Sequence, residues 1–148
     1  MCLVVGLVLA GCGSATGDSI LFTKDDGSRT IAVMNADGTE VRQLTDYDDS
    51  SDGSAVWSPD SDSIAFTSNR DGDYEIFVMN VDGTEVRQLT DNDDSSDRFA
   101  VWSPDGDSIA FMSDRDGDFE IFVMNADGTG VFSTGQNGVP HDWGGPAD

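Results

Sequence analysis

Two acidic segments of the sequence place oxygen-bearing side chains at alternate positions around a glycine, which is how many calcium-binding loops are built. They occupy residues 69–75 (NRDGDYE) and 114–120 (DRDGDFE). The spacing lacks the distant bidentate glutamate of an EF-hand, and a tight hairpin with solvated aspartates fits the same residues. If these segments bind Ca²⁺, the ligands are Asp71, Asp73, Glu75, Asp114, Asp116, Asp118 and Glu120.

A second acidic set precedes two of the tryptophans. Its members fall in two stretches, 46–52 and 91–97, which repeat each other 45 residues apart. Gathered on one face, these carboxylates would form a negative surface suited to a basic peptide or a cation. The alternative is a charged, solvated rim that binds no ligand. The candidate partner-binding face consists of Asp46, Asp48, Asp49, Asp52, Asp91, Asp93, Asp94 and Asp97.

The sequence contains none of the residue patterns that carry common enzyme chemistry. His141 is the only histidine, and there is no G-x-S-x-G motif, zinc-type Cys/His cluster or phosphate-binding G-x-x-x-x-G-K-[ST] loop. Aspartate pairs of the glycosidase kind are frequent, but they recur at turn positions, unlike a unique active site. Both cysteines, Cys2 and Cys12, lie near the N-terminus. We predict a non-catalytic protein with no cofactor, apart from the calcium considered above.

The balance of charge and hydrophobicity narrows the class of partner. The 148 residues have a formal net charge of −22, from 29 acidic and 7 basic side chains. Such a surface repels nucleic acids and anionic lipid headgroups, attracts basic partners or divalent cations, and also suits a medium of high salt. A hydrophobic content of 37% is too high for a disordered acidic tail. We predict a folded domain that does not bind nucleic acid.

The N-terminal segment is typical of a targeting sequence. Residues 3–10 are apolar and too short to span a bilayer. They lead into Leu9-Ala10-Gly11-Cys12, which resembles the lipobox of bacterial and archaeal lipoproteins, although no basic residue precedes the apolar run. We predict a signal peptide over 1–11, lipidation of Cys12 and a tether over 12–18, so that only the lipid contacts the membrane. A chance apolar leader is the alternative.

A 45-residue repeat organises the rest of the chain. Trp57-Ser58-Pro59-Asp60 recurs as Trp102-Ser103-Pro104-Asp105. The phrase Val-Met-Asn-x-Asp-Gly-Thr occurs three times at the same spacing, beginning at Val33, Val78 and Val123. Copies at a fixed interval of this length are the signature of a repeat architecture.

A complete repeat contains four strand signals, which we label A to D. In the second repeat they cover 54–57, 63–67, 75–80 and 85–90, separated by Ser-Pro-Asp, Gly-containing and Asp-Gly turns. Strand C is apolar on both faces, so it belongs to a sheet packed between two others. Four strands in 45 residues is the spacing of a β-propeller blade, and a solenoid of hairpins is the alternative.

The repeat resembles that of the TolB-type β-propeller family. The resemblance rests on the phrases WSPDG, RDGD, EIFVMNADGT and RQLT, and it extends over residues 19–143. TolB propellers have six blades and bind protein partners in the cell envelope, and the resemblance implies the same fold and general role here. It does not identify a ligand, because propellers carry many unrelated functions.

Counting strands predicts an all-β chain of about three four-stranded antiparallel blades, half of a six-bladed ring. The first repeat lacks strand A, and a final strand A surrounds Trp143. Three blades are too few to close a ring and would expose two apolar faces. We therefore predict a homodimer in which each chain completes the first blade of the other; a fragment of a longer propeller is the alternative. The strands are BCD over 19–45, ABCD over 54–90, ABCD over 99–134 and A over 139–144.

Trp57, Trp102 and Trp143 recur once per blade, which favours packing between blades over a ligand site. Together these features predict a lipid-anchored protein on the periplasmic or extracellular side of the cell envelope. Its repeat domain over 19–148 is expected to bind a protein or peptide. Two alternatives are a structural module that assembles end to end and a Ca²⁺-dependent carbohydrate-binding module.

Overall fold

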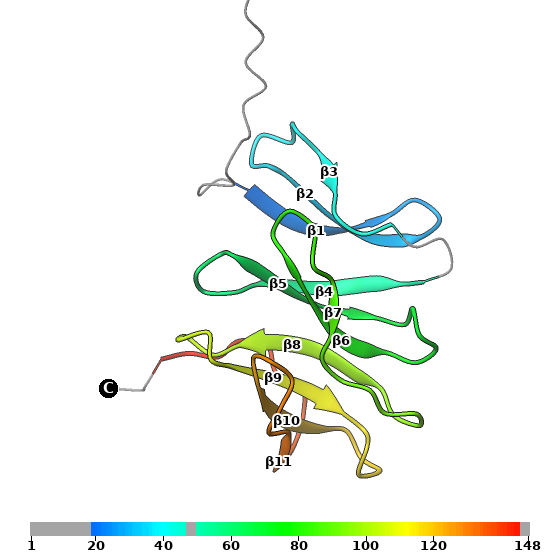
Figure 1. The fold of residues 1–148 in the computed structure, drawn as a ribbon, viewed down its shortest axis with the longest axis vertical. Coiled ribbons are helices and arrows are strands. Elements are labelled where there is room, and N and C mark those ends of the chain that lie inside the picture. Colours follow the sequence, from blue (N-terminus) through cyan, green and yellow to red (C-terminus); the bar gives the residue numbers. More distant parts are fainter. Residues whose placement is uncertain (1–18, 47–49, 146–148) are drawn as a thin grey trace, which may run out of the picture.

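The computed structural model describes residues 19–46 and 50–145, which form three antiparallel β-sheets stacked one on the next (Figure 1). The predicted all-β fold is confirmed. The predicted signal peptide and tether lie outside the described residues, as do Cys12, Asp48 and Asp49. Within the described ranges there is no helix of the length and apolarity needed to cross a membrane.

Each sheet follows one repeat, and within a sheet every strand pairs with the next strand of the chain. The first sheet contains β1 (Ser19–Asp25), β2 (Arg29–Asn35) and β3 (Arg42–Gln43). The second contains β4 (Asp52–Trp57), β5 (Ser63–Ser68), β6 (Glu75–Asn80) and β7 (Arg87–Gln88). The third contains β8 (Asp97–Trp102), β9 (Ser108–Ser113), β10 (Glu120–Asn125) and β11 (Phe132–Asn137).

The sheets pack face to face through apolar side chains. One core cluster joins the first and second sheets and contains Ile31, Val33, Leu44, Ile64, Phe66, Phe77 and Met79. Another joins the second and third sheets and contains Ala65, Ile76, Ala100, Ile109, Phe111, Phe122 and Met124. The middle sheet is therefore buried on both faces, as its doubly apolar strand C predicts. Stability comes from contacts between neighbouring repeats.

The turns between strands C and D of the second and third sheets also fasten each of these sheets to the preceding one. Gly83 has a φ of 87°, and a Cβ at this position would lie 2.7 Å from the carbonyl oxygen of Leu44. Gly128 makes the same close approach one repeat later. Arg42 of β3 donates a hydrogen bond of 3.0 Å to the carbonyl oxygen of Asp82 in this turn. Only glycine allows both the left-handed backbone and the close contact.

The structure differs from the expected strand bounds at several places, one of which is β11, which ends at Asn137 instead of residue 134. Strand A begins two residues early, at Asp52 and Asp97, and a bulge in it gives Ser54 and Phe99 positive φ angles of 50° and 57°. Strand D is only two residues long in the first two sheets. Residues 139–144, expected as another strand A, carry no strand, because no described strand lies beside them for pairing.

Candidate functional site: an acidic loop face

The described members of the two acidic sets lie at one end of the sheets. Asp52 of β4 pairs with Ser68 of β5, which in turn pairs with Glu75 of β6. The third sheet repeats this register, so the loops between strands B and C and between D and A share one end. We call this end the acidic loop face; it comprises Asp46 and residues 69–74, 91–96 and 114–119.

Most carboxylates on the acidic loop face are exposed. Among the described residues their side chains form no hydrogen bond and no ion pair, so these carboxyl groups face solvent. Like charges held close together favour a cationic ligand over an anionic one. The residues of this kind are Asp46, Asp71, Asp91, Asp93, Asp94, Asp116 and Asp118.

Many acids at the opposite end of the sheets are bonded within their own turns. Asp60 accepts hydrogen bonds from Ser58 Oγ at 2.6 Å and from the Asp62 amide at 3.1 Å. Asp82 accepts bonds from the hydroxyl and the amide of Thr84. These bonds, above all those from the hydroxyls, hold the pKa of both carboxyls below the usual value. The same bonding and the same pKa direction recur at Asp37, Asp105 and Asp127.

Asp52 and Asp97, which we expected on the binding surface, are fully buried. Arg70 donates to the Asp52 carboxylate at 3.1 Å, and Arg115 donates to that of Asp97 at 2.7 Å. Each guanidinium also lies over two phenylalanine rings, 5.3 and 4.8 Å from their centroids. The sequence reasoning missed both arginines, although Asp and Arg recur together 18 residues apart in the two repeats. These buried charges are compensated in place and support the loops above them.

Glu75, a candidate calcium ligand, is 2% exposed and lies between the second and third sheets. Its carboxylate accepts hydrogen bonds from Thr90 Oγ1 and from the Asn92 amide, the latter at 2.9 Å. Burial and the neighbouring carboxylate of Asp97 raise the pKa of Glu75 to about 7, although the two accepted bonds act in the opposite direction. Burial between the sheets therefore favours the protonated form of Glu75, compared with an exposed glutamate.

The remaining candidate calcium ligands do not converge on one point. Asp114 accepts a hydrogen bond of 2.7 Å from the Ser96 amide, and Glu120 accepts one of 2.5 Å from Ser133 Oγ. Asp73 is half-buried, and the others are exposed: Asp71, Asp116 and Asp118. Across residues 19–46 and 50–145, no three acidic, histidine or cysteine side chains are placed to hold a metal ion. Calcium binding stays a prediction, which the melting temperature with and without Ca²⁺ tests.

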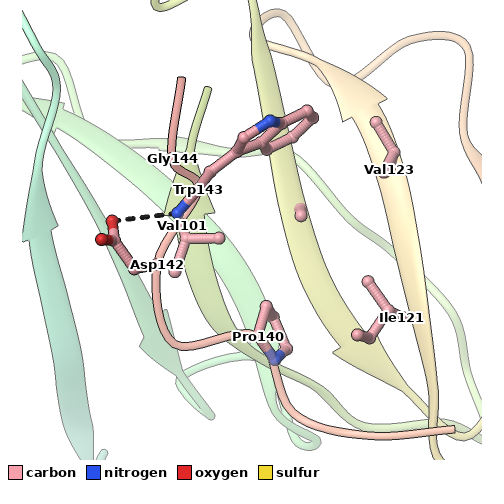
Figure 2. A pocket seen from close by; sticks show the side chains of 8 residues that line it. Val101, Ile121, Val123, Pro140, Asp142, Trp143 and Gly144 are labelled. Carbon is pink, nitrogen blue, oxygen red and sulfur yellow. Dashed lines mark hydrogen bonds between the residues drawn. The ribbon is translucent and has the colours of Figure 1, made fainter. Parts of the chain in front are cut away.

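The three tryptophans lie against the faces of the sheets. Trp57 and Trp102 are half-buried and pack on the two core clusters. Trp143 and Pro140 lie over the outer face of the third sheet, where they line a cavity of about 310 Å³ (Figure 2).

The sequence profile of the TolB beta propeller domain matches residues 5–96 and 57–140, which together cover most of the chain. The chain belongs to the TolB β-propeller family. Among solved structures, this TolB-family chain is similar to a putative TolB from Agrobacterium tumefaciens, with 28% identity and a TM-score of 0.72 over 79% of this chain. TolB from Acinetobacter baumannii has 25% identity and a TM-score of 0.67 over 81% of this chain.

The TolB-family chain spans 45% of the length of the first of these proteins and 30% of the second. A nidogen/laminin complex shares the fold alone, with 21% identity and a TM-score of 0.69 over 86% of this chain and 48% of that one. Hydrolases and lyases also contain propellers of this shape, so the fold by itself does not determine chemistry. No curated protein matches the chain.

Proposed function

We propose that this TolB-family protein is a non-catalytic lipoprotein of the cell envelope whose acidic loop face binds a basic segment of a protein or peptide. The observation that carries the proposal is the unequal use of aspartates at the two ends of the sheets. Many acids at one end are bonded within their turns, whereas the exposed aspartates of the acidic loop face have no side-chain partner among the described residues. The periplasmic location of TolB-like proteins supports a place in the envelope.

The loops of the acidic loop face are fixed to each other before any partner arrives. Asn69 Oδ1 accepts a hydrogen bond of 2.7 Å from the Ser51 amide, and Asp114 Oδ1 accepts an equal one from the Ser96 amide. Each bond joins a loop between strands D and A to the following loop between B and C. Residues held in place by these bonds lose less conformational entropy on binding, so the charges beside them contribute more to affinity.

Charge variants at the two ends of the sheets test this proposal. The double variant Asp93→Asn/Asp94→Asn removes two free carboxylates from the acidic loop face. We expect it to retain less partner from an envelope extract than the wild-type protein does. Binding by the wild-type protein is also expected to weaken as salt rises, because salt screens exposed charges.

The matched control is Asp62→Asn/Asp107→Asn, which removes the same charge from exposed positions at the opposite end. It should retain the same proteins as the wild type. If both double variants lose binding equally, net charge rather than the acidic loop face accounts for it, and the proposal fails.

The lipid anchor has a separate test. We expect Cys12→Ser to move the protein from the detergent phase to the aqueous phase after phase separation of whole cells, because one acylated residue supplies the attachment. Cys2→Ser is the control and should leave the protein in the detergent phase. An unchanged distribution of the Cys12 variant would exclude the anchor.

We also propose that the acidic loop face belongs to a closed ring of two copies. The described chain provides three sheets, and an open stack leaves apolar side chains exposed at its ends, for example Ile20 at 42%. Burying these faces against a second copy removes them from water. Native mass spectrometry should show a dimer, and a monomer at micromolar concentration would contradict the ring.

A further inference from the structure

The outer face of the third sheet and the open edge of the first sheet fit one occupant, a second copy of this chain. We propose that residues 138–144 of one copy form strand A of the blade whose strands B, C and D are β1, β2 and β3 of the other. The inference rests on the proposed two-copy ring and assigns the strand pairing that joins the copies.

Trp143 packs on the third sheet in the same way as each tryptophan of a strand A packs on the sheet that precedes it. Trp102 packs on the cluster that contains Ile76 of the second sheet. Trp143 lies beside Ile121 and Val123, and Ile121 is the counterpart of Ile76 one repeat later (Figure 2). The segment therefore occupies the place of a further strand A, and no strand B among the described residues pairs with it.

The first residue of this segment makes the same backbone hydrogen bond as the first residue of strand A in the third sheet. The amide of Asp97, the first residue of β8, donates to the carbonyl oxygen of Tyr74 at 2.6 Å. The amide of Gly138 donates to the carbonyl oxygen of Phe119, the counterpart of Tyr74, at 3.3 Å. In both cases a tryptophan follows five residues later in the sequence. Both ends of the segment thus match strand A.

We call the proposed pairing between residues 138–144 of one copy and β1 of the other the joint. Its second half is the free edge of β1. This strand has the position of strand B, but no described strand pairs with its other side, whereas β5 and β9 are paired on both sides. Ile20 of β1 is 42% exposed, although its counterparts Ile64 and Ile109 are fully buried. An unpaired edge next to an exposed apolar side chain is a template for another strand.

The complete sheets fix the register of the joint. In both of them the tryptophan of strand A pairs with the isoleucine of strand B. The same register places Trp143 opposite Ile20 of the other copy, and Asp142 opposite Leu21. Ile20 and Phe22 lie on the same face of β1, because side chains alternate along a strand. They would fill the cavity of about 310 Å³ beside Trp143.

Disulfide trapping between two separately prepared variants tests this register. One full-length variant carries Leu21→Cys and the other Asp142→Cys, both with Cys2→Ser and Cys12→Ser. After mixing and mild oxidation we expect a disulfide-linked dimer, because directly opposed strand residues bring their Cβ atoms within reach of a disulfide. The control pairs Leu21→Cys with His141→Cys, since a shift of one residue turns the side chain to the other face of the sheet.

Several-fold more linked dimer from the in-register pair than from the shifted pair supports the joint, provided that each variant alone stays unlinked. A dimer by native mass spectrometry that forms no in-register link overturns the strand pairing and leaves the two-copy ring standing. A monomer overturns both. Partner binding by the acidic loop face is measured independently through the variants at Asp93 and Asp94.

Discussion

The buried carboxyl groups of Glu75 and Asp97 lie near each other between the second and third sheets, where burial makes ionisation of Glu75 costly. The ordinary pKa of 4.5 applies in the unfolded chain, whereas the folded value is about 7. Between these values the native state holds a proton that the unfolded state has lost. The free energy of unfolding therefore falls as pH rises through this window and levels off above it. The loss is at most about 3 kcal/mol.

We expect Glu75→Gln to flatten this pH dependence and to stabilise the protein above about pH 7. Glutamine does not ionise, while its amide oxygen can still accept bonds from Thr90 and Asn92, and its amide nitrogen can donate to Asp97. Urea unfolding at about pH 5 and about pH 8 measures both effects. The exposed Glu85→Gln is the control. If the two variants show the same pH dependence as the wild type, Glu75 is not the group responsible.

The pairing of Arg115 with Asp97 gives a second prediction at the residue scale. Arg115→Met leaves the fully buried Asp97 carboxylate without its guanidinium, which costs about 3–5 kcal/mol of unfolding free energy. Arg115→Lys should lose less, because it keeps the charge but not the planar stacking on the rings. Denaturant unfolding measures both. Arg87→Met, at an exposed position, is the control, and an equal loss there would contradict the buried pairing.

At the scale of elements, the turn between strands C and D connects neighbouring sheets, and Gly83→Ala tests that role. The added methyl meets the Leu44 carbonyl at 2.7 Å, in addition to the strain of a positive φ. Gly72 also has positive φ, but a Cβ there meets nothing within 4 Å. We expect Gly72→Ala to cost about 1–2 kcal/mol and Gly83→Ala clearly more. Equal losses in thermal or urea unfolding would mean that the turn does not hold the sheets together.

The strand order could be predicted from the sequence because each repeat carries its own turn residues and its own apolar pattern. Strand C of the second repeat has the expected bounds, Glu75–Asn80. Strand A begins earlier than expected because its pairing with strand B continues on the other side of the bulge that precedes Val56. Strand D is shorter than expected in the first two sheets, whereas in the third sheet β11 continues to Asn137, beyond the expected end at residue 134.

The buried part of the site could not be predicted, because acids that look alike in the sequence differ only in burial. Asp94 and Asp97 stand in one acidic stretch, yet Asp94 is exposed and Asp97 is fully buried. The difference arises because strand A begins at Asp97 and because Arg115, from the loop that follows strand B, reaches the Asp97 carboxylate. Asp97 and Glu75 belong to neighbouring sheets, so no local sequence pattern indicates that they are in contact. The exposed acids of the same loops could be assigned to one end from the strand order alone.

At the scale of the whole molecule, the two ends of the stack differ. A Cβ at Gly38, in the first C–D turn, would meet no atom within 4 Å, whereas Gly83 and Gly128 press on the sheet before them. In the proposed ring this free turn meets β11 of the other copy. There Phe132, 56% exposed, has the pairing position that Arg87 has in the second sheet. The joint therefore lacks an arginine-to-carbonyl bond, and we infer that it is weaker than the contacts within one chain.

Phe132→Arg is accordingly expected to strengthen the dimer. The new guanidinium would reach the carbonyl oxygens of Ala36 and Asp37 in the other copy, as Arg42 reaches those of the next turn within one chain. The ring of two copies contains this joint twice, so one added hydrogen bond of about 1 kcal/mol at each joint lowers the Kd of the dimer about 30-fold, which sedimentation measures. Gln136→Arg adds the same charge to the same exposed strand. An equal decrease in Kd for this control would mean that reduced charge repulsion causes the gain. It would also mean that the turn at Gly38 does not contact β11 of the other copy.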